Sequence, residues 1–209
     1  MNVPFSRPDL SRFIQEGTDA AVSKVTFPDG TSQTTAVSPP LTAFRNSSVQ
    51  RELTIVSGNP SVVTNPGDTK GGAVTELSTP IVLPYANQNV FITCRVVGEL
   101  DINSANFGLI LHRSGGGLTS KFLRPPADGD RGRFLTPSVI SISDDDSSLD
   151  AMIITFVDDT TTNAGTYIYT PVCVRSEGNN STYHLNNTSG AGTTAGAEVS
   201  TSTMVLQVI

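Results

Sequence analysis

Short apolar runs separated by turn residues fill most of the chain beyond residue 45. Apolar and polar residues alternate in GTYIYTPVCVR at 165–175 and in STSTMVLQVI at the C-terminus, which predicts strands with one buried face. The segments between the runs are rich in Gly, Pro, Asn and Asp, which favour turns. The predicted strands span 51–57, 75–83, 89–97, 106–113, 137–143, 150–157, 165–175, 181–186 and 199–209. This pattern predicts an all-β fold, a β-sandwich or jelly-roll head of about eight or nine strands.

A helical pattern occurs near the N-terminus, in residues 8–16. Leu10, Phe13 and Ile14 recur at i, i+3 and i+4 and make one apolar stripe, and Gly17 is a suitable stop. A helix this short cannot bury its own stripe. We therefore expect it to dock on a sister chain or on another protein; the alternative is a terminal helix packed on its own domain.

Residues 22–36 predict a small β-unit. Val25 and Phe27 share one face of a strand, a Pro-Asp-Gly turn follows at 28–30, and polar residues alternate on the return. One hairpin is barely stable alone, but three copies around an axis can close a small core. The expected attachment and trimer contacts are the apolar side chains of this unit and of the preceding helix, namely Leu10, Phe13, Ile14, Val25 and Phe27.

A domain boundary is predicted at 37–44, because the pair Pro39-Pro40 cannot continue a helix or a central strand. Residues 1–44 are thus expected to form an attachment and trimerisation segment, and residues 45–209 the head. The chain ends on an apolar strand, whose residues include Met204, Leu206 and Ile209. Such an ending predicts a strand buried at an oligomer axis or centrally within the monomer.

Composition and charge exclude several classes of function. Only 15% of residues are charged, and the polar character comes from Ser, Thr, Asn and Gly, which suits strands and turns better than helical bundles. The net charge is -6 without any Lys/Arg cluster, so nucleic acid is not an expected partner. No secretory signal or membrane-spanning run is visible, which predicts synthesis in the cytoplasm without membrane insertion.

The two cysteines, Cys94 and Cys173, lie inside apolar runs. Two buried free thiols are the favoured interpretation, and a disulfide between them is the alternative. Two isolated cysteines without a nearby His do not make a zinc pattern.

Acidic residues cluster at Asp144, Asp146 and Asp150, with the pair Asp158-Asp159 nearby. Oxygen ligands on loops suit calcium, so Asp144, Asp146 and Asp150 are the candidate metal ligands. The run lacks the EF-hand spacing, and a solvated turn is the favoured alternative. No cofactor is expected.

No catalytic machinery is recognisable. His112 and His184 lie in predicted strands and are interpreted as strand-face residues, and the G-x-S-x-G element of serine hydrolases is absent. Residues Asn46, Asn180, Asn186 and Asn187 are among those that begin N-x-S/T sequons, which we interpret as a by-product of a chain rich in Ser, Thr and Asn. The chain is therefore expected not to be an enzyme.

The four tyrosines raise the question of sugar binding. Tyr167 and Tyr169 share one face of a strand, and together with Tyr85 and Tyr183 they would form a stacking surface if all four faced outward. Placement in the core is the alternative interpretation, and the one favoured.

Two passages resemble bacteriophage fibre proteins. The stretch VTFPDGTSQTTA at 25–36 is similar to an FPDGT-x-Q-x-x-A element of virion fibre and appendage proteins, notably of cyanophages. The final strands, including TYIYTPV, TYHLNNT and STMVLQVI, resemble those of trimeric, tumour-necrosis-factor-like knobs at fibre tips, although Gln207-Val208 replaces the more usual Met-Glu. The resemblance covers residues 22–36 and 150–209, about a third of the chain.

The resemblance implies a virion protein: a homotrimeric short fibre or spike, mounted through its N-terminus on a tail, baseplate or capsid protein. Its head would contact the host surface, for example a glycan. The alternatives are a capsid decoration protein and, from another class, a module that binds or cleaves carbohydrate. A slender segment has too little interior per chain to offset backbone ordering, which is the physical reason to expect three chains around an axis.

Overall fold

The chain divides into two compact units, residues 1–39 and residues 40–209, in the computed structural model. The structure describes residues 25–26, 32–33, 41–55, 71–101, 107–125, 134–136, 149–175, 180–188 and 199–209.

In the first unit, β1 (Val25–Thr26) pairs antiparallel with β2 (Ser32–Gln33), within the stretch where the sequence predicts a β-unit. The predicted helix at 8–16 lies outside the described residues. The same is true of the side chains expected to make attachment or trimer contacts, which are Leu10, Phe13, Ile14, Val25 and Phe27.

The second unit contains two antiparallel sheets. The six-stranded sheet consists of β3 (Thr42–Ser47), β4 (Arg51–Ile55), β7 (Val90–Leu100), β10 (Asp150–Asp158), β12 (Ser181–Leu185) and β13 (Ser202–Val208). The five-stranded sheet consists of β5 (Gly71–Ala73), β6 (Thr79–Leu83), β8 (Phe107–Gly115), β9 (Lys121–Leu123) and β11 (Gly165–Arg175).

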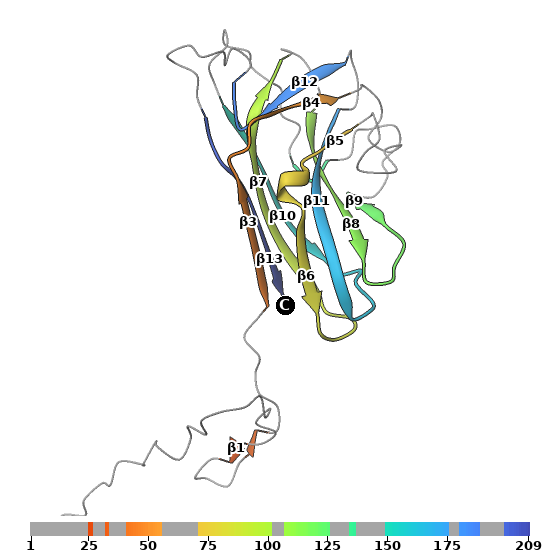
Figure 1. The fold of residues 1–209 in the computed structure, drawn as a ribbon. Helices are drawn as coiled ribbons and strands as arrows, with labels where there is room; N and C mark the ends of the chain where they lie inside the picture. Colours follow the sequence, from red (N-terminus) through yellow and green to blue (C-terminus); the bar gives the residue numbers. More distant parts are fainter. Residues whose placement is uncertain are drawn as a thin grey trace, which may run out of the picture. The chain divides into compact units, whose positions relative to one another are not determined.

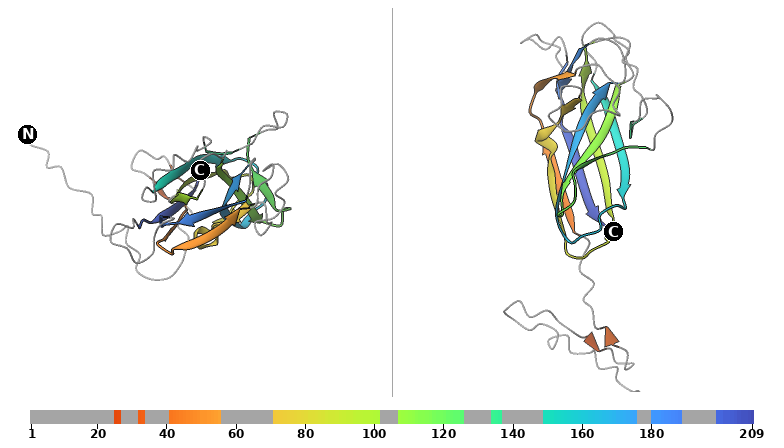
Figure 2. Two further views of the ribbon diagram at one scale, coloured as in Figure 1. Left: turned by 90° about the horizontal axis from the view of Figure 1, so that it is seen from above. Right: turned by 90° about the vertical axis from the view of Figure 1, so that its right-hand side faces the viewer.

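The two sheets pack face to face as a jelly-roll-like sandwich (Figure 1). Strands that follow each other in sequence repeatedly change sheet, as β6 to β7, β7 to β8 and β10 to β11 do. Figure 2 shows the same two layers in two further views. The all-β sandwich predicted from the sequence is therefore confirmed. Among the described residues, the helical structure is one 3-10 turn, η3 (Thr75–Leu77), and no helix is long and apolar enough to cross a membrane.

The core lies between the sheets and follows the alternation of the sequence. In β10, Met152 and Ile154 point inward and are at most 3% exposed, whereas Ile153 between them is 54% exposed. In β13, Met204 and Leu206 are fully buried. Each such side chain contributes about 1.5–3 kcal/mol when it leaves water, so this inner face accounts for the stability of the sandwich.

The C-terminal strand β13 lies centrally, between β3 and β7. Its buried residues are covered within the monomer, which is the alternative that does not require an oligomer axis. The strand β3 begins at Thr42, inside the stretch 37–44 that the sequence assigns to a boundary. The division between the two units, after Pro39, falls inside the same stretch. The sequence does not indicate β3, because an edge strand needs few buried residues and therefore shows little apolar alternation; in β3, only Ser47 is buried.

Gly98 allows the upper part of β7 to change partner from β13 to β12. A Cβ atom at Gly98 would lie 2.3 Å from the carbonyl oxygen of His184, a distance that real Cβ atoms do not reach. The glycine thus permits the close approach of β12, whose residues Tyr183, His184 and Leu185 pair with Leu100, Glu99 and Gly98.

Candidate functional site

The outer face of four strands of the six-stranded sheet carries five apolar side chains among mostly uncharged polar ones, and three of the five are exposed. Phe44 on β3 is 62% exposed, and Ile153 and Val157 on β10 are 54% and 40% exposed. Phe91 on β7 and Val205 on β13 lie between them and are half-buried. Twelve positions on this side of the four strands are called the outer face below. They form three cross-strand rows: Thr42, Gln207, Phe91 and Val157; Phe44, Val205, Thr93 and Thr155; Asn46, Thr203, Arg95 and Ile153.

The outer face carries one charged residue, Arg95. Its Nη1 donates a hydrogen bond to the carbonyl oxygen of Thr201 at 2.9 Å, so the guanidinium is partly satisfied within the chain. The remaining positions are apolar, Thr, Asn or Gln. An exposed apolar surface of this kind is typical of a face that another protein surface covers.

A polar pocket of about 260 Å³ is lined by residues of β4, of β12 and of the segments beside them. These two strands lie at the end of the sandwich opposite to the C-terminus (Figure 1). The lining residues of the pocket are Gln50, Arg51, Glu52, His184 and Asn187. Register places His184 directly opposite Glu52, and its Nδ1 lies 3.8 Å from Glu52 Oε1. The pocket therefore offers hydrogen-bond donors and acceptors and no apolar side chain.

Asn186 holds the two walls of this pocket together. It is fully buried with a φ of 56°, a left-handed conformation that Asn tolerates better than most residues. Its Nδ2 donates to the carbonyl oxygens of Ser47 at 3.0 Å and Val49 at 2.9 Å, and its Oδ1 accepts from the hydroxyl of Ser202 at 2.6 Å. The turn after β12 is thus fixed to the β3–β4 connection, next to Gln50.

Arg51 is tied to the opposite sheet. Its Nη2 donates to the carbonyl oxygen of Ala73 at 2.7 Å, and its Nε lies 3.1 Å from the carboxylate of Glu76. The carboxylate of Glu52 is 75% exposed. The ion pair with Glu76 largely balances the positive charge of Arg51 before any ligand enters the pocket.

The structure describes only part of the acidic cluster singled out in the sequence. Asp150 and Asp158 lie at opposite ends of β10, roughly 26 Å apart at strand rise, so they cannot share a cation. Asp144 and Asp146 lie outside the described residues. Within the described ranges, no group of three or more His, Cys, Asp or Glu residues is placed to hold a metal ion.

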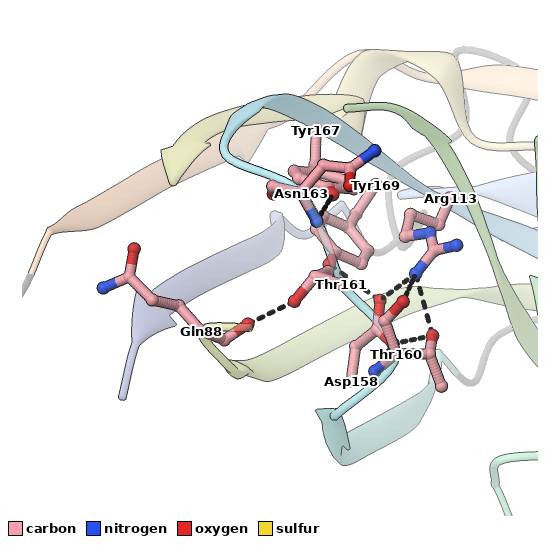
Figure 3. A network of polar contacts seen from close by, with 8 residues as sticks. All are labelled: Gln88, Arg113, Asp158, Thr160, Thr161, Asn163, Tyr167 and Tyr169. Carbon is pink, nitrogen blue, oxygen red and sulfur yellow. Dashed lines mark hydrogen bonds and ion pairs between the residues drawn. The ribbon is translucent and has the colours of Figure 1, made fainter. Parts of the chain in front are cut away.

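Asp158 instead forms a buried ion pair with Arg113 (Figure 3). Arg113 Nη1 lies 3.2 Å from Asp158 Oδ2, and both side chains are at most 3% exposed. Asp158 also accepts hydrogen bonds from the Tyr169 hydroxyl at 2.9 Å and from the Thr160 amide at 3.1 Å. Burial, and secondarily the Asp158 carboxylate, raises the pKa of Tyr169 well above its ordinary value, so Tyr169 remains a neutral donor.

The same close-up shows how the loop after β10 is fastened. The Tyr167 hydroxyl donates to the carbonyl oxygen of Asn163 at 2.9 Å, and the Thr161 hydroxyl donates to the carbonyl oxygen of Gln88. The guanidinium carbon of Arg113 lies 5.6 Å from the centre of the Tyr167 ring. The network therefore joins both sheets and is structural.

The tyrosines do not form a common stacking surface. Tyr167 and Tyr169 are fully buried and Tyr183 is 2% exposed, whereas Tyr85 is 67% exposed. The sugar-stacking hypothesis for these four residues is therefore wrong, because three of them fill the core between the sheets. The alternative placement in the core is confirmed.

The predictions for the cysteines and histidines agree with the structure. Cys94 and Cys173 are buried free thiols. His112 lies buried in β8, with its ring centre 5.1 Å from that of Phe122, and desolvation lowers its pKa. His184 is a strand-face residue, as predicted, but it also lines the pocket, which the sequence does not indicate.

The sequence matches no protein-family model and no curated protein. Solved structures match the sandwich at a distance. A chain of infectious bursal disease virus strain Gt shows 10% identity and a TM-score of 0.44, over 88% of this chain and 46% of that one. Eiger TNF from S. frugiperda shows 6% identity and a TM-score of 0.38, over 82% of this chain and 94% of that one. A chain of strain Gx of the same virus shows 13% identity and a TM-score of 0.41, over 82% of this chain and 37% of that one.

This chain thus spans less than half the length of the viral chains it matches. The similarity is one of fold.

Proposed function

We propose that this chain is a non-enzymatic structural protein of a bacteriophage particle, a short fibre or spike whose heads associate as a homotrimer. Residues 1–44 mount it on another virion protein, and the sandwich forms the outward head. The resemblance of residues 22–36 to fibre elements supports the virion role. The observation that carries the assembly is the apolar outer face of β3, β13, β7 and β10.

A second copy of this chain is the partner that best fits the outer face. Arg95 is the one charge among its twelve positions, so like copies can approach without strong repulsion, and no oppositely charged partner is called for. Burying the exposed parts of Phe44, Ile153 and Val157 would stabilise association by roughly 1–2 kcal/mol for each side chain. That gain over three subunits is large enough to offset much of the cost of association.

The positions of the chain entry and of the pocket, at opposite ends of the head, fit mounting through the N-terminus. The chain enters β3 at Leu41, whose carbonyl oxygen accepts a hydrogen bond from the Val208 amide at 2.9 Å, beside the C-terminal residue Ile209. The strands β4 and β12, whose residues line the pocket, lie at the other end of the sandwich (Figure 1). A head held at Leu41 would therefore present the pocket end outward.

The mass of the full-length chain in solution tests the assembly. We expect light scattering after gel filtration to give three times the chain mass of 22.0 kDa. The variant Phe44→Ser should dissociate at concentrations where the parent chain is trimeric. The matched control is Val82→Ser, which replaces a side chain that is 55% exposed on β6 of the other sheet, and it should remain trimeric. A stable monomer of the parent chain, or equal behaviour of the two variants, would refute assembly through the outer face.

A capsid decoration protein is the second candidate, because a knob on the shell also needs an anchor and a compact trimer. Imaging phage particles with a labelled antibody against this chain separates the two. Signal on the tail supports the fibre, signal over the shell supports decoration, and absence of signal from the particle would contradict the virion role.

The polar pocket favours a third candidate, a module that acts on carbohydrate, but it favours binding over cleavage. Glycoside hydrolysis needs one desolvated carboxyl beside an ionised one, whereas the Glu52 side chain is 75% exposed. Incubation of the pure chain with host-surface glycans should leave them intact. Release of shorter glycans would overturn the non-enzymatic assignment.

A further inference from the structure

We propose that the pocket between β4 and β12 binds one neutral sugar ring. This inference deepens the proposed host contact by naming the class of ligand. The class of ligand is inferred from the residues that line the pocket, and the experiment that tests it is separate from the test of trimer assembly.

The lining groups match sugar hydroxyls, which both donate and accept hydrogen bonds. Glu52 offers an exposed carboxylate, and Gln50 offers an amide that both donates and accepts. Asn187 has a buried side-chain oxygen that accepts no hydrogen bond from the residues that the structure describes. Buried acceptors are normally satisfied, so this atom points to a donor group supplied from outside, such as a sugar hydroxyl.

The local charge favours a neutral sugar over an acidic one. Arg51 is paired with Glu76 at 3.1 Å, so its charge is already balanced. His184 lies between two carboxylates, opposite Glu52 on β4 and Glu99 on β7. The groups around the pocket therefore carry no surplus of positive charge that would recognise a sugar carboxylate or phosphate.

The size of the pocket limits the ligand to one ring. Its volume of about 260 Å³ is below the range of about 300–1,000 Å³ typical of sites for larger ligands. Its described lining residues include no Phe, Tyr or Trp, so a single site should bind in the millimolar range. Three linked sites on a trimer would raise the apparent affinity for a surface that displays many copies of the sugar.

The site is also held in shape before binding. Asn186, which precedes Asn187, is bonded to the backbone of Ser47 and Val49 just before Gln50. The two walls of the pocket are thus fixed relative to each other, which lowers the entropy that a ligand must overcome.

Saturation-transfer NMR of the full-length chain tests this proposal with a panel of neutral hexoses and N-acetylhexosamines, and with glucuronic acid as the acidic comparison. We expect transfer to at least one neutral sugar and a weaker signal for glucuronic acid. The variants Glu52→Gln and Asn187→Ala should weaken binding by roughly tenfold, the effect of one lost hydrogen bond. Thr54→Ala, two residues along the same exposed face of β4, is the matched control and should bind as the parent does.

Melting temperature and solution mass are measured for every variant, so that loss of fold or of the trimer is distinguished from loss of the site. Sugar binding by a monomeric parent chain would support the pocket while contradicting the trimer. Three results would overturn the inference: no transfer to any neutral sugar, preference for glucuronic acid, or unchanged affinity in both folded pocket variants.

Discussion

Replacing Asp158 with asparagine should destabilise the sandwich strongly. The substitution keeps the shape of the side chain but removes the charge that faces Arg113 across 3.2 Å, where both side chains are at most 3% exposed. Breaking a buried pair by removing one partner costs about 3–5 kcal/mol, because the remaining charge stays buried without compensation. A domain of this size is stable by about 5–15 kcal/mol in total, so the loss is a large fraction.

Urea unfolding at one fixed protein concentration measures this loss. The chain has four Tyr and no Trp, so tyrosine fluorescence and circular dichroism are the suitable signals. The expected change corresponds to a fall in melting temperature of about 6–20 °C. Asp159→Asn is the matched control, because Asp159 is the exposed neighbour of Asp158, and it should change stability by less than about 0.5 kcal/mol.

A double-mutant cycle sharpens the result. Arg113→Met combined with Asp158→Asn should cost less than the sum of the two single changes, because the double variant no longer buries an unpaired charge. A loss in Asp158→Asn no larger than that in Asp159→Asn, or strictly additive energies in the cycle, would refute the assignment of the pair as a structural clamp.

The remaining predictions concern buried groups. Burial raises the pKa of Cys94 to about 12 and raises that of Cys173 as well. At pH 8 both thiols should therefore resist Ellman's reagent in the folded chain and react fully in guanidinium, and rapid labelling of the native protein would contradict this. Desolvation lowers the pKa of His112 below its ordinary value of 6.5, so the unfolded state binds the proton more readily than the folded state does. The free energy of unfolding should therefore fall as the pH drops below 6.5, and it should fall less in His112→Gln; urea unfolding at pH 7 and pH 5 measures both changes. Asn186→Ala should lower the free energy of unfolding by about 2–4 kcal/mol, through lost hydrogen bonds and a strained φ, and Asn186→Gly should lower it less because glycine accepts that φ. Equal losses of the two variants in urea unfolding would show that the backbone conformation is unimportant.

The sequence predicts the strands whose two faces differ. Alternation predicted β11 and β13; β13 has one face in the core, whereas β11 alternates in burial only up to Tyr169 and is buried on both faces from there to Arg175. The short strands β5 and β9 were missed, since three residues are too few to show a period. The edge strand β3 was missed because its side chains are mostly exposed, which leaves a polar pattern that resembles a linker.

The candidate sites were harder to predict, since they depend on register. Gln50 and Asn187 are far apart in sequence and meet because β4 pairs with β12. The sequence does not indicate that Asn186 is structural. Asn residues in general tolerate a left-handed conformation, so Asn186 looks like the other Asn residues of polar loops. Asp158 resembles its neighbour Asp159 in sequence, yet Asp158 is the last residue of β10 and is buried, whereas Asp159 lies beyond the strand and is exposed.

The central place of β13 has a consequence for biosynthesis. The strand β3 pairs with β13, whose residues are made about 160 residues later. At translation rates of about 5–20 residues per second, β3 must wait roughly 8–30 s for this partner, and one edge of β7 must wait roughly 5–20 s. During that interval a nascent chain exposes unsatisfied backbone amides and carbonyls, and the six-stranded sheet closes only after β13 has left the ribosome.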